Sequence, residues 1–146
     1  MTHIESPLTA GPTAARLRFV LVRLARTLRR AGQSTLTPSQ VSALATVEDF
    51  GPLRISALAT HEAMDPSVAT RVVASLEVLG LLIRTDDPED KRASLVDLSE
   101  SGRRALIELW NERTLGLNSR LERLTQKERH AVETALPALE KLARDN

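Results

Sequence analysis

Several residue types that define common functional sites are absent or scarce in this chain. Cysteine is absent, which excludes disulfide bonds, thiolate zinc sites, cysteine nucleophiles and cysteine-based oxidant sensing. Tyrosine is also absent, and the aromatic side chains are two phenylalanines and one tryptophan. The longest apolar run, residues 78–83, is far shorter than the roughly 20 residues that cross a bilayer, and the amino terminus has no hydrophobic signal core. We therefore expect a soluble cytoplasmic protein with no membrane partner.

Charge gives little guidance to function when the chain is taken as a whole. The 146 residues carry a formal net charge of +1. Residues 1–35 hold six arginines and one glutamate, whereas residues 36–83 hold two arginines and five acidic residues. A nucleic-acid-binding role therefore needs support from motifs, because bulk charge does not supply it.

Leucine stripes predict amphipathic helices near both ends of the chain. Between residues 13 and 31, leucines recur every three or four positions with arginines between them, which is the pattern of an amphipathic helix. Leucines hold heptad-like spacing over residues 100–123, and a capping box of Thr125 and Glu128 begins a last helix that extends to about residue 143.

Capping signals in the middle of the chain predict three further helices. A capping box at residues 37–40, with proline at the first helical position, begins a helix expected over residues 38–49. A short helix is expected within residues 54–64. Asp65 as N-cap, followed by a proline, begins the next helix, and Gly80 ends it.

The segment from residue 81 to residue 99 combines two aliphatic stretches with a strongly charged loop. Both stretches are rich in β-branched and aliphatic residues, so they predict two antiparallel strands. The seven positions Asp86–Arg92 between them hold four acidic and two basic residues. The loop lacks the glycine and the glutamate that shape an EF-hand, so we predict no metal site. An exposed hairpin tip also offers neither the burial nor the cleft that a catalytic carboxylate pair needs.

No other group of residues predicts catalysis or a cofactor. His61 and His130 are isolated, and neither has a second potential ligand at the i+4 position. The chain has no glycine-rich phosphate loop and no Ser-His-Asp set that can be placed together. A small hydrolase is therefore the weakest alternative, and we predict a protein that is not an enzyme and needs no cofactor.

The order of elements is that of a winged helix-turn-helix: a helix, a tight connection, a helix with a small polar face, and a charged hairpin. The blocks LTPSQVSALATV, RISALA, DPSVATRVVASLEVLGLLIR, DDPEDKR and VDLSESGRRAL resemble successive blocks of the MarR family of transcriptional regulators, in register over residues 36–106. The most specific parts are the wing tip with Asp90 and Arg92 and the sequence LSESG, which is similar to the family's Leu-Thr-x-x-Gly. The resemblance implies a mainly α (α+β) fold, a winged helix-turn-helix with a two-stranded wing, flanked by amino- and carboxyl-terminal dimerisation helices.

The resemblance also implies an organisation and partners. Residues 1–35 would form a tail and a dimerisation helix, residues 36–99 the DNA-binding lobe, and residues 100–146 further dimerisation helices. The homodimer would repress transcription from a pseudo-palindromic operator in double-stranded DNA, and a small lipophilic or aromatic effector would release it. Leucine content supports the dimer independently, because a lobe of about 70 residues cannot cover both terminal stripes. The predicted dimerisation residues are Leu17, Leu21, Leu24, Leu117, Leu121, Leu136 and Leu139.

The wing is expected to supply contacts to DNA. Arg92 is predicted to enter the minor groove, where narrow A·T-rich stretches concentrate negative potential. Asp90 is predicted to hold the guanidinium of Arg92 through a charge-assisted bond. Arg84 and Lys91 are predicted to contact phosphates. The remaining acids, expected to turn away from the DNA or to cap the loop, are Asp86, Asp87 and Glu89.

The helix that begins after Asp65 is the predicted recognition helix. Ser67, Thr70 and Arg71 share its small polar face close to the amino terminus, where backbone amides attract phosphate. Arg71 can pair with guanine or grip a phosphate, whereas the hydroxyls are less selective. We therefore predict that these three residues contact the major groove.

Two alternatives stay open. Trp110 is expected in the dimer core, but it could instead line an effector pocket. The lobe itself is acidic, which disfavours high non-specific affinity for DNA. A protein-interaction module with weak or no specific DNA binding is therefore the alternative function, and the acids that motivate it are Asp49, Glu62, Asp65 and Glu77.

Overall fold

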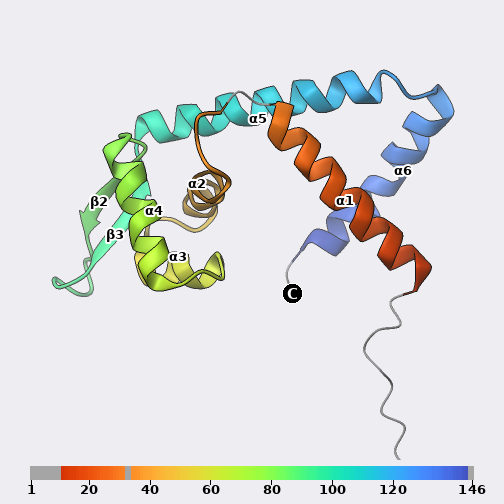
Figure 1. Ribbon diagram of the computed structural model, residues 1–146. Helices are drawn as coiled ribbons and strands as arrows, with labels where there is room; N and C mark the ends of the chain where they lie inside the picture. The colour runs from red at the N-terminus through yellow and green to blue at the C-terminus, as the bar shows by residue number, and fades with distance from the viewer. Residues whose placement is uncertain (1–10, 32–33, 145–146) are drawn as a thin grey trace, which may run out of the picture. The chain divides into compact units, whose positions relative to one another are not determined.

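The computed structural model describes residues 11–31 and 34–144 (Figure 1). Contacts divide the chain into two units: the winged lobe, Gln33–Asn111, and the terminal helices, which are the described parts of Met1–Gly32 and Glu112–Asn146. The elements in chain order are α1 (Pro12–Ala31), α2 (Pro38–Phe50), β1 (Leu53–Arg54), α3 (Ile55–His61), α4 (Pro66–Val78), β2 (Leu82–Asp86), β3 (Ser94–Leu98), α5 (Glu100–Leu121) and α6 (Gln126–Ala143).

Two helices of the winged lobe, α2 and α4, begin at their predicted capping residues. At the start of α2, Thr37 Oγ1 accepts a hydrogen bond from Gln40 N at 3.2 Å, and Gln40 Oε1 accepts one from Thr37 N at 2.8 Å. These two bonds confirm the capping box. Asp65 caps α4, and Gly80 follows the end of α4 with a φ of 71°. This left-handed conformation suits glycine, because glycine has no Cβ to clash with the backbone.

The Leu-Ser-x-x-Gly sequence joins the start of α5 to the end of α4. Ser99 Oγ accepts from Gly102 N at 2.9 Å and donates to Gly80 O at 2.5 Å. Gly102 is buried against the backbone of Leu81, and a Cβ at this position would lie 2.1 Å from the Leu81 carbonyl oxygen. Both the hydroxyl and the missing side chain are therefore needed for this close approach.

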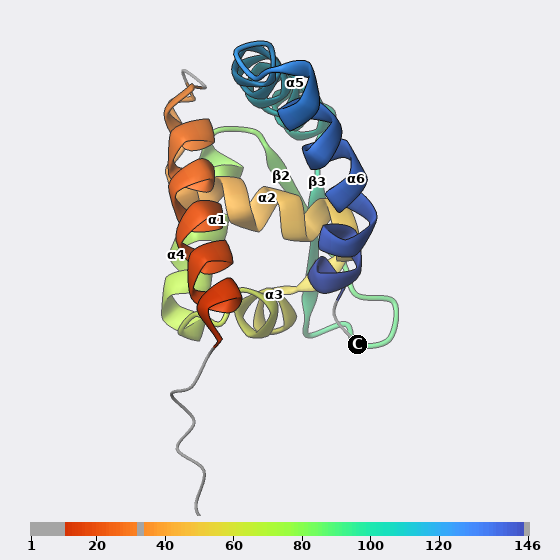
Figure 2. The same cartoon turned by 90° about the vertical axis from the view of Figure 1, so that its right-hand side faces the viewer.

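The winged lobe has one contiguous apolar core. It lies between α2, α3, α4, the sheet and the first half of α5, and Figure 2 shows the lobe from the side. The largest fully buried side chains are leucines of α2, α3 and α4 and valines of α2, α4 and β3. The core residues are Ala43, Leu44, Val47, Leu53, Leu58, Val73, Leu76, Leu82, Val96, Leu98 and Leu106.

The predicted hairpin is present, but it belongs to a three-stranded antiparallel sheet with the order β1-β3-β2. β2 and β3 pair along their whole length, and Asp86 lies opposite Ser94 next to the loop. The third strand, β1, was not expected, because a strand of two residues is too short to show alternation. It places Arg54 opposite Leu95 of β3, beside the hairpin.

The predicted terminal helices are present as α1, the end of α5, and α6. The Thr125 and Glu128 capping box at the start of α6 is confirmed. α6 has no buried residue, and neither do the described side chains of α1. In the first half of α5, Leu106 and Leu109 are buried, and this half belongs by its contacts to the winged lobe. No helix in the described ranges has the length and apolar character needed to cross a membrane.

Candidate nucleic-acid interface

Two segments at one end of the winged lobe form the candidate interface. The amino-terminal end of α4 and the loop between β2 and β3 lie at the same end of the lobe in both views (Figures 1 and 2). A winged helix-turn-helix uses this arrangement to place one helix in a groove of DNA. All six predicted contact residues are exposed: Ser67, Thr70 and Arg71 on α4, Arg84 on β2, and Lys91 and Arg92 in the loop.

The first turns of α4 are hydrogen-bonded within the protein. Asp65 Oδ1 accepts from Ser67 Oγ at 2.6 Å and from Ser67 N at 2.9 Å, and these bonds lower the pKa of the Asp65 carboxyl below its ordinary value. Thr70 Oγ1 donates to Pro66 O at 2.9 Å. Both hydroxyl protons are therefore used internally, which leaves the hydroxyl oxygens as acceptors. Arg71 has no ion pair within the described part of the chain, so its donors remain for a ligand.

The wing loop is closed by its own backbone. Asp87 N donates to Ala93 O at 3.3 Å, and Ala93 N donates to Asp90 O at 2.9 Å. Asp90 Oδ1 accepts from the backbone N of Arg92 at 3.0 Å. This differs from the expectation that Asp90 binds the guanidinium of Arg92, and among the described residues no ion pair joins these two side chains. The reason is local, because an aspartate readily hydrogen-bonds the backbone two residues ahead.

Asp87 is the one buried charged residue in the described ranges, with an exposed fraction of 5%. Its Oδ1 accepts from Glu89 N at 2.9 Å, and its Oδ2 accepts from Arg54 Nε at 2.7 Å. The Glu89 amide and then the Arg54 guanidinium hold the pKa of the Asp87 carboxyl below its ordinary value. A buried carboxylate is tolerated only when it is paired and hydrogen-bonded, as it is here. Asp87 therefore caps the loop and ties it to β1.

Arg84 is paired with a carboxylate of α4. Its Nε lies 2.6 Å from Glu77 Oε1, and its Nη2 lies 3.1 Å from Glu77 Oε2. This forked hydrogen bond raises the pKa of the Arg84 guanidinium. A contact between Arg84 and phosphate would have to compete with Glu77. Arg71, Lys91 and Arg92 are therefore the cations of the candidate interface that carry no ion pair within residues 11–31 and 34–144.

The sequence predicted that Asp87 turns away from the DNA or caps the loop, and the bond from Glu89 N agrees with capping. Sequence reasoning missed the partners Arg54 and Glu77, and Glu77 was considered only as one of the acids that disfavour DNA binding. Arg54 lies 33 positions before Asp87, and no local pattern indicates a contact over that separation.

Comparison with known proteins identifies the family. The sequence pattern of the MarR family matches residues 36–94. An uncharacterized HTH-type transcriptional regulator of Mycobacterium leprae is 42% identical over 114 residues, which cover 73% of this chain and 80% of that protein. The chain belongs to the MarR family. It is a transcriptional regulator with a DNA-binding winged helix-turn-helix, and it is not an enzyme.

Solved structures agree with the MarR fold. A protein of Pseudomonas aeruginosa PA01 is 32% identical, with a TM-score of 0.80 over 92% of this chain and 95% of that one. A MarR family protein from Bacillus stearothermophilus is 26% identical, with a TM-score of 0.72 over 87% and 89% of the two chains. The mainly α fold with a winged helix-turn-helix is thereby confirmed.

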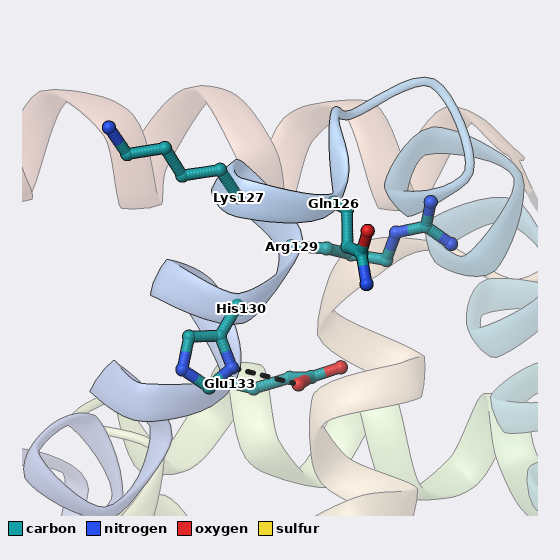
Figure 3. Close-up of a pocket in the computed structure, with 5 residues that line it drawn as sticks. All are labelled: Gln126, Lys127, Arg129, His130 and Glu133. Carbon is teal, nitrogen blue, oxygen red and sulfur yellow. Dashed lines mark ion pairs between the residues drawn. The ribbon is translucent and has the colours of Figure 1, made fainter.

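One hollow on the described surface of the MarR-family chain lies on a single helix. The surface hollow in Figure 3 is lined by one helix, α6, and His130 Nδ1 lies 3.9 Å from Glu133 Oε2 beside it. A polar hollow on a single helix lacks the apolar walls typical of a small-molecule site. Trp110 is not part of its lining, and 41% of its surface is exposed. The residues that line the hollow are Gln126, Lys127, Arg129, His130 and Glu133.

Proposed function

We propose that the chain is a repressor that binds a pseudo-palindromic operator in double-stranded DNA as a homodimer. The observation that carries the proposal is the position of the unpaired cations. Arg71 on α4 and Lys91 and Arg92 in the wing loop are exposed at two segments that lie at one end of the lobe. Counterion release from DNA by such cations supplies affinity, and a helix in the major groove supplies sequence selection.

On α4, the proposed readout uses one donor and two acceptors. The hydroxyl protons of Ser67 and Thr70 are used by Asp65 and Pro66. Their oxygens can therefore accept from the amino groups of cytosine or adenine, while Arg71 can donate to guanine or to a phosphate. This division makes α4 a reader of bases with few phosphate contacts.

In the wing, the proposed contact is Arg92 in the minor groove, with Lys91 on the phosphates. The experiment compares Arg92→Ala with Lys91→Ala, which removes the same charge one residue away, in binding assays with genomic operator fragments. We expect Arg92→Ala to weaken binding by about tenfold or more, because one base-reading arginine contributes roughly 1–3 kcal/mol. Lys91→Ala should instead cause a smaller loss of affinity. It should also make the dependence of the logarithm of the binding constant on the logarithm of the salt concentration shallower by about one unit. If Arg92→Ala leaves the affinity for DNA unchanged, the proposed contact between the wing and the DNA is wrong.

The proposed dimer rests on the terminal helices. Each of the seven predicted dimerisation leucines keeps exposed surface in the single chain, and Leu21 and Leu136 are each almost half exposed. Uncovered apolar stripes of this kind mark partner surfaces. Sedimentation should show that the wild type is a dimer and that Leu21→Glu or Leu136→Glu dissociates it. Val78→Glu is the control, because it lies at an exposed position of the winged lobe and should leave the dimer intact. A wild-type monomer would refute this part of the proposal.

Release by a small lipophilic or aromatic effector is the remaining part. Trp110 is the only tryptophan, so its fluorescence reports one site. A screen of phenolic and lipophilic compounds should find ligands that change this fluorescence and release operator DNA at the same concentrations. The absence of any such compound would indicate a regulator without an effector. Retention of a protein partner, with no sequence-selective DNA binding at about 100 mM salt, would instead favour the interaction module.

A further inference from the structure

The ion pair between Arg54 and Asp87 joins two parts of the winged lobe that are distant in sequence. Arg54 ends β1 and is the N-cap residue of α3, the first helix of the helix-turn-helix. Asp87 is the first residue after β2. The pair therefore connects the body of the helix-turn-helix to the point where the wing loop begins.

Hydrogen bonds made by Asp87 and Asp90 hold the backbone of the loop that carries Arg92. Asp87 Oδ1 accepts from Glu89 N, and the Asp87 amide donates to Ala93 O across the loop. Asp90 then fixes the backbone N of Arg92. The buried carboxylate thus holds the Glu89 amide, and the Asp87 backbone holds Ala93, the residue after Arg92. The Arg92 side chain itself is exposed.

We propose that Arg54 and Asp87 are positioning residues that hold the wing loop in the conformation in which Arg92 reaches the minor groove. The proposal rests on the proposed DNA contact of Arg92. Without the pair, the loop would have to be ordered when DNA binds, and ordering lowers affinity. Neither residue needs to touch DNA for this effect.

Electrostatics and positioning predict opposite results for one substitution. Asp87→Asn removes a negative charge from the end of the lobe that faces the phosphates, so electrostatics alone predicts tighter binding. Positioning predicts weaker binding, because an amide does not replace the ion pair with Arg54. Asp86 provides the matched control, since it is the adjacent acid, is exposed, and makes no side-chain hydrogen bond or ion pair within the described residues.

The experiment measures operator affinity with the full-length protein. Asp87→Asn should raise the Kd by about two- to tenfold, which corresponds to the ordering of one rotamer-rich side chain. Asp86→Asn should leave the Kd unchanged or lower it. Arg54→Gln should weaken binding more than Arg103→Gln. These arginines are 45% and 46% exposed, and Arg103 pairs with Glu48 on α2 and with Asp97 on β3.

A double-mutant cycle with Arg92→Ala separates positioning from general loss of stability. Asp87→Asn should have no further effect in the Arg92→Ala background, whereas a destabilised lobe would lose the same factor in both backgrounds. Equal losses, or tighter binding by Asp87→Asn, would overturn the proposal.

The same cycle distinguishes the two proposals. If Arg92→Ala weakens binding and Asp87→Asn does not, only the positioning role fails. If Arg92→Ala has no effect, the wing contact itself is wrong, and the positioning role fails with it. Should Asp87→Asn not fold, Arg54→Lys keeps the charge but loses the two guanidinium nitrogens, Nε and Nη2, that contact Asp87 Oδ2. It should weaken binding only when Arg92 is present, and unchanged affinity would refute the role.

Discussion

The winged lobe and the terminal helices bury their apolar side chains in different ways. Every buried apolar residue in the described ranges lies between Val41 and Leu109, within the lobe. α1 and α6 have amphipathic sequences but no buried side chain among those described, and Phe19 on α1 is more than half exposed. The lobe therefore makes its core from its own residues, whereas the uncovered apolar side chains of the terminal helices support the proposed dimer.

The arginines of the two regions differ in the same way. In the lobe, Arg54, Arg84 and Arg103 pair with carboxylates. α1 has six arginines and no acidic residue. The guanidinium carbon of Arg23 lies 5.3 Å from the centre of the Phe19 ring on the same helix. Because ion pairs within the lobe occupy several of its arginines, few cations are left to contact DNA. The positions of these few define the candidate interface.

The largest expected loss of stability comes from a substitution in the core of the lobe. Leu44→Ala, at a position with no exposed surface, should lower the free energy of unfolding by about 2–5 kcal/mol. Leu136→Ala on α6 should cost far less in the isolated chain and should act through dimerisation. Urea unfolding at several protein concentrations distinguishes them, because only the dimer-dependent loss changes with concentration. A concentration-dependent effect of Leu44→Ala would contradict the division into two regions.

The next effect concerns the close contact between α5 and the chain after α4. Gly102→Ala places a Cβ 2.1 Å from the Leu81 carbonyl oxygen, so it should destabilise the lobe by about 1–3 kcal/mol. Gly11→Ala is the control, because a Cβ there meets no atom within 4 Å. Thermal unfolding of both variants measures the difference. Equal melting temperatures would show that the contact relaxes without cost.

The capping boxes of α2 and α6 allow the same substitution to be made in both regions. Thr37→Ala removes the cap of α2, and Thr125→Ala removes the cap of α6. Each loss should be about 1 kcal/mol of helix stability. In the lobe the loss should appear as lower global stability, whereas in α6 it should appear as faster hydrogen exchange of the first turn. If both variants lower the global stability equally, the two regions unfold together.

The smallest effect concerns pH. The pKa of Asp87 lies below its ordinary value of 3.8, because the Glu89 amide and the Arg54 guanidinium favour the charged form. The stabilisation is therefore complete above the ordinary pKa and is lost as the pH falls through the lower pKa of the folded protein. Urea midpoints measured from neutral to acid pH should fall less steeply for Asp87→Asn than for the wild type. Glu128→Gln on α6 is the comparison, since the pKa of Glu128 is also lowered, by Thr125.

Local signals predicted much of the fold. Caps at Thr37, Asp65 and Thr125 act between residues two or three positions apart, so the sequence contains both partners. The two residues of β1 carry no such signal. In the wing the signal was local but its partner atom was wrongly predicted, because the Asp90 side chain was expected on the Arg92 guanidinium and instead bonds the Arg92 backbone amide.

The sequence by itself determined where the helices and the hairpin form, because capping and hydrophobic periodicity depend on neighbours along the chain. It also determined the family, through blocks of residues at fixed spacing. Only the tertiary structure decided which charges are free. Asp87 meets Arg54 across 33 positions, and Glu77 on α4 meets Arg84 on β2. Such pairs form when folded segments bring two side chains within hydrogen-bond distance, and this proximity is a property of the packed lobe.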